Sequence, residues 1–101
     1  MKVIWSPRAV ARAAEIATYI AADRPDAAAE WVDALFAAVA GLKNHPKRGR
    51  RVPEVDRPTI REVLHGRSRV IYYRVDPSQI VVLTVRHGRR EWDPGELRPE
   101  E

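Results

Sequence analysis

Residues 68–87 read SRVIYYRVDPSQIVVLTVRH, and this segment predicts two neighbouring β-strands. In its first half the apolar side chains alternate, with Val70 and Tyr72 on one face and Ile71 and Tyr73 on the other, which is the period of a strand. The four residues DPSQ in the middle have proline at the second position and predict a type I turn. A turn this short joins the two strands in antiparallel fashion.

The alternation extends toward the N-terminus, where residues 59–65 read TIREVLH and predict one more strand. Gly66 separates it from the segment above, so the three strands form an antiparallel meander. The last strand, residues 79–87, is apolar on both faces. We expect it to be a central strand that helices cover.

The N-terminal half changes to a helical pattern. Residues 2–5, KVIW, predict a short strand, and Ser6 followed by Pro7 predicts the start of a helix. Pro25 ends this helix and opens a second one, which stops at residues 43–46, KNHP. Two helices joined so tightly form an antiparallel hairpin. Four aromatic residues of this half are expected to pack within the hairpin: Trp5, Tyr19, Trp31 and Phe36.

The predicted fold class is therefore α+β, with the element order β-α-α-β-β-β and a helical hairpin packed on one face of a small, mainly antiparallel sheet. A chain of 101 residues is the size of one domain. We expect that domain to span residues 1–90 and an acidic C-terminal tail to span residues 91–101.

Composition excludes several kinds of chemistry. There is no cysteine, so neither a thiol nucleophile nor a thiolate metal site is possible. The three histidines lie in separate segments without metal-ligand spacing, and the glycine-rich phosphate motifs are missing. We expect no metal and no cofactor. No apolar stretch is long enough for a signal peptide or a membrane span, which predicts a cytoplasmic protein that does not enter the membrane.

The net charge of +4 is distributed unevenly. Residues 43–90 contain thirteen basic and four acidic residues, whereas residues 91–101 contain one basic and five acidic residues. This bias favours a polyanionic or acidic partner over a merely solvated surface. The cations of the strand region are Arg61, Arg67, Arg69, Arg74, Arg86, His87, Arg89 and Arg90, and those of the preceding loop are Lys47, Arg48, Arg50 and Arg51.

Structural roles are the alternative for these side chains. Arg69 and Arg74 could form ion pairs with Glu62 or Asp76 across the sheet. His87 could be a strand-end residue that hydrogen-bonds to the backbone, and the alternative for Arg86, Arg89 and Arg90 is simple solvation. The density of charge, and a glycine at position 88 that lets the chain turn, favour a binding site.

The chain resembles the RelE/ParE toxins of type II toxin–antitoxin modules, from about residue 2 to about residue 90. The resemblance rests on the order of elements, on the opening VIWSPRAVARAAEIATYIAADRPDAA, and on GRSRVIYYRV followed after one turn by VLTVRHGRR. The family implies the fold above and two mechanisms. RelE-like members cleave mRNA in the ribosomal A site, whereas ParE-like members poison DNA gyrase and cleave no RNA themselves.

The resemblance transfers roles to individual residues. Arg69, directly before the strand VIYYRV, falls on a catalytic arginine of RelE, and Arg89 or Arg90 falls on a second one. Many RelE-like members have a proton-relaying tyrosine where this chain has Trp92, whose indole can stack on a base but cannot titrate. If the chain is RelE-like and an endoribonuclease, its catalytic candidates are Arg69, His87, Arg89 and Arg90.

The missing tyrosine and the sequence RHGRR favour the ParE-like function, in which the chain has no catalytic activity of its own. The target-binding surface is then expected to comprise Arg61, Arg67, Arg69, Arg86, His87, Arg89, Arg90 and Trp92. A third possibility is a non-toxic basic module that binds nucleic acid.

The resemblance also implies partners. A cognate antitoxin, whose acidic C-terminal segment wraps the toxin, is expected to bind exposed apolar residues of the helical hairpin. The target is expected to be DNA gyrase with DNA, or the ribosome with mRNA. The acidic tail could fold back on the basic surface and mask part of it.

Overall fold

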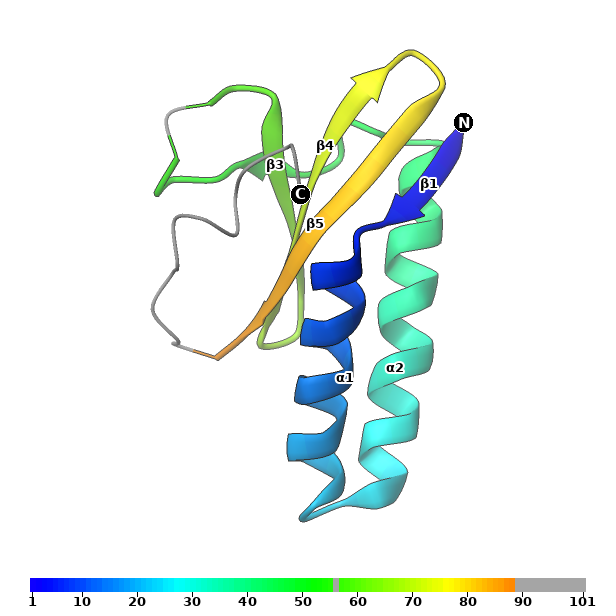
Figure 1. Cartoon of the computed structure of the whole chain (residues 1–101), viewed down its shortest axis with the longest axis vertical. Helices are drawn as coiled ribbons and strands as arrows, with labels where there is room; N and C mark the ends of the chain where they lie inside the picture. The colour runs from blue at the N-terminus through cyan, green and yellow to red at the C-terminus, as the bar shows by residue number, and fades with distance from the viewer. Residues whose placement is uncertain (56, 89–101) are drawn as a thin grey trace.

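A computed structural model describes residues 1–55 and 57–88, apart from the side chains of residues 74 and 75, and Figure 1 shows their arrangement. Two helices pack against one sheet, so the predicted α+β class and element order are confirmed. The elements in chain order are β1 (Lys2–Trp5), α1 (Pro7–Ala21), α2 (Pro25–Ala40), the 3₁₀ helix η1 (Gly41–Lys43), β2 (Arg50–Arg51), β3 (Ile60–His65), β4 (Ser68–Asp76) and β5 (Gln79–His87).

The sheet has five strands in the order β1-β5-β4-β3-β2. Strands β3 to β5 pair in antiparallel fashion, as predicted for the meander. Strand β2 also pairs with β3 in antiparallel fashion, and β1 pairs with β5 in parallel. The edge strand β2 lies within the segment that the sequence predicted to be a loop. It pairs Arg50 with Glu62 and Arg51 with Arg61. A strand of two residues has no periodicity to detect, which is why the pattern missed it.

The predicted helix starts are confirmed. Ser6 is the N-cap of α1, where its Oγ accepts from the amide N of Ala9 at 3.0 Å. The same hydroxyl donates to the carbonyl oxygen of Leu83 in β5 at 2.9 Å, so the cap also fixes the start of the helix to the sheet. Pro7 and Pro25 occupy the first positions of α1 and α2, where a missing N–H leaves no helical bond unmade.

The hairpin covers one face of the sheet and forms the main hydrophobic core there. We call this the helix face. Its buried cluster comprises Ala9, Ile16, Leu35, Val39, Val70, Val82 and Val85. The stripe of apolar side chains along α1 and α2 thereby leaves water, which is the main source of stability for helices of this length.

The opposite face of the sheet is covered by the segment between β2 and β3, and we call it the loop face. The sequence predicted the hairpin on one face of the sheet, which is confirmed, but it did not predict that a loop covers the other apolar face of the last strand. Here Val52 and Ile60 pack with Ile71 of β4 and Leu83 of β5 in a second buried cluster. A β-bulge between Ile71 and Tyr72 gives β5 an extra residue at this point. Strand β5 is apolar on both sides because each side has its own cover.

The aromatic residues of the hairpin do not all pack inside it. Trp31 is half-buried, as predicted, and Trp5 packs against the core. Tyr19 is 75% exposed, so the expectation that it packs within the hairpin is wrong. Phe36 is 52% exposed but its ring contacts that of Trp5, so its packing is partial. Within the described residues, neither helix is both long and apolar enough to span a membrane.

Candidate functional site

The cations at the ends of β4 and β5 are divided between the two faces of the sheet. Arg69 is paired in register with Arg86, and Ser68 is paired with His87. Successive side chains of a strand point to opposite faces, so each of these pairs lies on its own side. The contacts described below place Ser68 and His87 on the helix face and Arg69 on the loop face. The sequence RH at the end of β5 thus contributes to two surfaces.

On the helix face, His87 belongs to a small polar cluster. The Nδ1 of His87 lies 2.8 Å from the Oγ of Ser68, which is almost fully buried. The indole Nε1 of Trp31 in α2 donates to the same Oγ at 3.1 Å, and its ring meets the imidazole edge-on with centroids 6.2 Å apart. The structural alternative for His87 named a backbone partner, whereas the hydrogen bond seen here joins two side chains. It ties the end of β5 to the hairpin.

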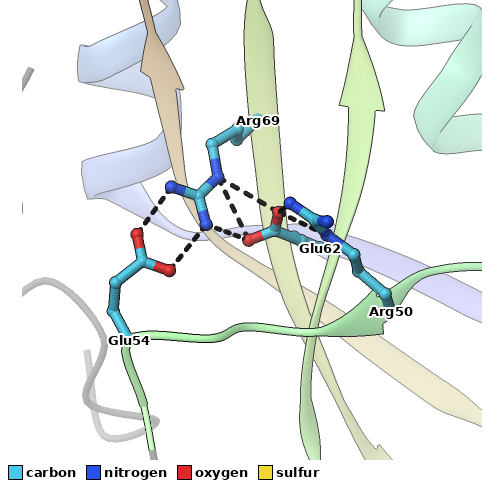
Figure 2. A network of polar contacts seen from close by, with 4 residues as sticks. All are labelled: Arg50, Glu54, Glu62 and Arg69. Carbon is cyan, nitrogen blue, oxygen red and sulfur yellow. Dashed lines mark hydrogen bonds and ion pairs between the residues drawn. The ribbon is translucent and has the colours of Figure 1, made fainter. Parts of the chain in front are cut away.

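On the loop face, Arg69 lies at the centre of an ionic network, as Figure 2 shows. Glu62 of β3 forms its base, with a side chain that is 0% exposed. The Nε of Arg69 lies 3.1 Å from both carboxylate oxygens of Glu62, and its Nη2 also contacts Oε1. Arg50 of β2 donates to Oε2 from Nε at 3.0 Å and from Nη2 at 2.9 Å. The predicted ion pair between Arg69 and Glu62 is confirmed.

Glu54 closes the network from the solvent side. Its two carboxylate oxygens accept hydrogen bonds from Nη1 and Nη2 of Arg69 at 2.7 and 2.9 Å, which is the parallel two-bond geometry of an arginine–carboxylate pair (Figure 2). Glu54 is partly exposed and comes from the segment between β2 and β3. Arg69 therefore contacts a buried carboxylate, that of Glu62, on one side and a partly exposed carboxylate, that of Glu54, on the other.

The two carboxylates also decide the electrostatics of the strand ends. The hydrogen bonds that Arg69 donates to Glu54, joined by its contacts with Glu62, raise the pKa of Arg69 even though burial opposes this shift. Arg86 faces Arg69 across the strand pair and is only 9% exposed, so the alternative of simple solvation is wrong for this residue. Like charges placed directly opposite each other destabilise a sheet, and Glu54 and Glu62 offset that repulsion.

The other predicted target-binding residues lie apart from this network. Arg61 donates from Nη1 to the carbonyl oxygen of Gly49 at 2.7 Å, so it supports the backbone before β2. Arg67 is exposed in the turn between β3 and β4, and its carbonyl accepts from the amide of Gly88 at 2.8 Å. Gly88 has a φ of 70°, which confirms the turn expected there.

The predicted residues Arg89, Arg90 and Trp92 lie outside the described residues, as does the acidic tail 91–101. Glu54 and Ser68, which organise the two clusters, were not among the predicted site residues. A signal for Glu54 existed, because it is one of only two acids in the basic segment PKRGRRVPEVDRP. For Ser68 the sequence offers no such signal.

A third feature is an apolar groove on the helical hairpin. The rings of Trp5 and Phe36 meet at a tilt with centroids 5.0 Å apart, and beside them a groove of about 210 Å³ runs between α1 and α2. Val10 on its rim is 55% exposed. The lining residues are Trp5, Val10, Ala13, Ala14, Ala17, Val32, Leu35 and Phe36. A nearly uncharged hollow of this kind fits apolar side chains of a partner.

The arrangement favours binding over metal chemistry. Among residues 1–55 and 57–88, no three side chains of the metal-ligating types come together. Arg50 and Arg69 are held by carboxylates and Arg61 by a carbonyl oxygen, and such fixed charges can recognise an anionic partner.

Comparison with protein families gives one match that spans nearly the whole chain. The model of the family described as "ParE toxin of type II toxin-antitoxin system, parDE" matches residues 3–92. A relative from Sinorhizobium fredii (strain NGR234), named "Putative toxin Y4kP", is 36% identical over 91 residues, which cover 90% of this chain and 92% of that protein.

Solved structures with the same fold come from two bacteria. One belongs to a chromosomal ParDE toxin–antitoxin system from P. aeruginosa, with a TM-score of 0.73 and 18% identity over 88% of this chain and 97% of that chain. Another is in the RelBE2 toxin–antitoxin complex from Mycobacterium tuberculosis, with a TM-score of 0.60 and 20% identity over 88% and 92% of the two chains. At these identities the likeness concerns the fold.

Proposed function

This chain belongs to the ParE family of toxins of type II toxin–antitoxin systems, and we propose that it arrests growth by poisoning DNA gyrase when its antitoxin is lost. In this proposal the toxin acts in the cytoplasm and traps the complex of gyrase with cleaved DNA. It needs no catalytic group of its own.

The state of Arg69 is the observation that supports this mechanism over RNA cleavage. An arginine that stabilises a scissile phosphate must present its donors to that phosphate. Here Glu54 and the buried Glu62 hold the donors of Arg69. In addition, Trp92 stands where many RelE-like toxins have a tyrosine, and an indole cannot relay a proton.

Two assays run side by side test the proposed target. We expect the purified chain to increase linear, gyrase-linked DNA in a plasmid cleavage reaction, and to leave mRNA on stalled ribosomes intact. Codon-positioned cuts in that mRNA, without gyrase-linked breaks, would refute the proposal and favour the RelE-like endoribonuclease. Normal growth on expression without a partner would instead favour a non-toxic nucleic-acid-binding module.

We further propose that the apolar groove on the hairpin binds the antitoxin. Both solved neighbours come from toxin–antitoxin systems, and the groove offers Trp5, Val10 and Phe36 as apolar contacts. An amphipathic segment of the antitoxin, with apolar residues spaced by one helical turn, would fill it.

Two exposed aromatic residues provide a matched test of the groove. Phe36 lines it, whereas Tyr19 is more exposed and is not part of its lining. We expect Phe36→Ser to weaken antitoxin binding by roughly tenfold or more, because aromatic anchors dominate such interfaces. Tyr19→Ser should bind like the parent chain. Equal binding by both variants would place the antitoxin elsewhere.

A further inference from the structure

The segment between α2 and β3 contains a second basic surface, distinct from the strand ends. Residues 43–51 read KNHPKRGRR and contain no acidic residue. The six basic or protonatable side chains in it are all exposed: Lys43, His45, Lys47, Arg48, Arg50 and Arg51. We call this segment the basic loop. In the view of Figure 1 it leaves the end of α2 and passes behind the sheet toward β3.

A buried tyrosine holds the basic loop against the sheet. The hydroxyl of Tyr72 donates to the carbonyl oxygen of Pro46 at 2.9 Å and accepts from the amide of Gly49 at 3.0 Å. Tyr72 is 1% exposed, and burial raises its pKa, so the hydroxyl keeps its proton. Arg61 adds a bond of 2.7 Å to the carbonyl oxygen of Gly49. Both backbone groups of Gly49 are thus bound to the sheet.

Close packing restricts the same backbone further. A Cβ atom at Gly49 would lie 2.5 Å from the carbonyl oxygen of Glu62 and 2.7 Å from the hydroxyl of Tyr72. The amide of Arg48 donates to the carbonyl oxygen of His45 at 3.0 Å, which closes a turn. The guanidinium of Arg48 lies against Gly41, at the C-terminal end of α2, where a helix attracts positive charge.

Beside this anchored backbone lies a shallow, open hollow. It has a volume of about 420 Å³ and is lined by His45, Pro46, Lys47 and Arg48. Anchoring the backbone before binding reduces the conformational entropy that would be lost when an anion binds. Arg50 is engaged with Glu62, whereas the exposed cations Lys47 and Arg48 line the hollow, where an external anion would meet them.

We propose that the basic loop binds the phosphodiester backbone of duplex DNA, with Lys47 and Arg48 each contacting a phosphate. The composition of the loop favours this partner over an acidic protein segment. Protein interfaces depend on aromatic or aliphatic anchors, and KNHPKRGRR contains none. Contacts to phosphates need only fixed cations and are independent of base sequence. This inference goes beyond the proposed poisoning of gyrase, because it requires this chain to bind DNA without gyrase.

Fluorescence anisotropy with a labelled duplex of about 20 base pairs, titrated with the purified full chain at several salt concentrations, tests the proposal. We expect Lys47→Glu and Arg48→Glu each to weaken binding by roughly tenfold and to reduce the salt slope by about one. The matched control is Arg24→Glu, which changes the net charge equally at the other end of α2. It should have only a small effect. If all three reversals weaken binding alike, only net charge matters and the proposal is wrong.

A second variant tests the anchor without changing any charge of the loop. Tyr72→Phe keeps the ring and removes the two bonds to Pro46 and Gly49. We expect several-fold weaker binding with an unchanged salt slope, since the same cations remain but are less well positioned. Binding equal to that of the parent chain would refute the role of the anchor.

Two further arms separate the partner classes. The first arm adds a glutamate-rich peptide at the same concentration as the duplex; competition that depends on Lys47 and Arg48 would contradict the DNA assignment. The second arm uses single-stranded RNA of the same length, and stronger binding of this RNA than of the duplex would contradict it too. Because no arm contains gyrase, a negative gyrase assay leaves this result intact, and the reverse is equally true.

Discussion

The two faces of the sheet are closed by different means. The helix face is closed by aliphatic side chains of α1 and α2, which pack around Leu35 and Val39 without help from charges. The loop face has a smaller aliphatic cluster, and beside it the ionic network of Glu62 with Arg50 and Arg69. Both covers exclude water, and in the second an ionic network with solvent-exposed members lies beside the aliphatic cluster.

This difference separates stability from recognition. Burial of aliphatic area stabilises the fold without regard to direction, but aliphatic side chains cannot bind a charged partner. An ionic network adds little net stability, but it holds charged groups in defined directions. This chain therefore places its main core under the hairpin and the oriented cations Arg50 and Arg69 at the other face. Four variants test this division, from the largest expected effect to the smallest.

Leu35→Ala should cause the largest loss of stability. Leu35 is fully buried in the helix-face cluster, and its truncation leaves a cavity that the hairpin cannot readily fill. We expect the free energy of unfolding to fall by about 3–5 kcal/mol, measured by urea denaturation. A loss below about 1 kcal/mol would show that the helix face is not the main source of stability. Val10→Ala, which removes an exposed side chain, is the control.

Glu62→Gln should destabilise the chain less, by about 2–3 kcal/mol. The substitution keeps the size of the side chain but removes the charge that holds Arg69, although exposure of Arg50 limits the loss on its side. Urea denaturation again gives the measurement. A loss as large as that of Leu35→Ala would contradict the contrast between the faces.

Tyr72→Phe probes the place where the chain crosses from one face to the other. Loss of the hydroxyl leaves two backbone groups unsatisfied, and we expect a loss of about 1–2 kcal/mol near neutral pH.

The hydroxyl of Tyr72 also makes the free energy of unfolding of the parent chain depend on pH, with a defined sign. Burial raises the pKa of Tyr72 above the ordinary value of about 10, so the stability that its neutral form contributes is complete below that pH and is lost as the pH rises through the folded-state pKa. Unfolding measured between pH 8 and 11 should therefore show a steeper fall in the parent chain than in Tyr72→Phe. Parallel curves would contradict the buried phenol, and Tyr19→Phe serves as the exposed control.

Glu54→Gln should have the smallest effect on stability, about 0.5 kcal/mol, because the pair with Arg69 is partly exposed. Its informative readout is the accessibility of Arg69 to an arginine-selective reagent such as phenylglyoxal. We expect faster modification in Glu54→Gln than in the parent chain, found by mass spectrometry of the peptide with Arg69. An unchanged rate would show that Glu54 does not cover this guanidinium.

Most of the fold could be predicted from local patterns. The alternation in residues 68–87 and the helix starts at Ser6 and Pro25 depend on neighbours in the sequence, so the order of strands and helices followed from them. The edge strand β2 could not be predicted, because its two residues are defined only by their pairing with β3.

The candidate site was predictable as a list of cations but not as an arrangement. The sequence identified Arg69, Arg86 and His87, and it offered the ion pair between Arg69 and Glu62 as an alternative. It could not show that Arg86 is nearly buried, or that Glu54 reaches Arg69 from a segment fifteen residues away. Such contacts depend on how the segment between β2 and β3 folds over the sheet.

The sequence by itself determined the class of this protein, because hydrophobic period, capping residues and charge bias are properties of neighbouring positions. Only the tertiary structure decided which charges act together. The pleat of β5 sends Arg86 and His87 to opposite faces, and the register with β4 gives each a different partner. Pairing across strands and loops depends on three-dimensional packing, so it cannot be read from the order of residues along the chain.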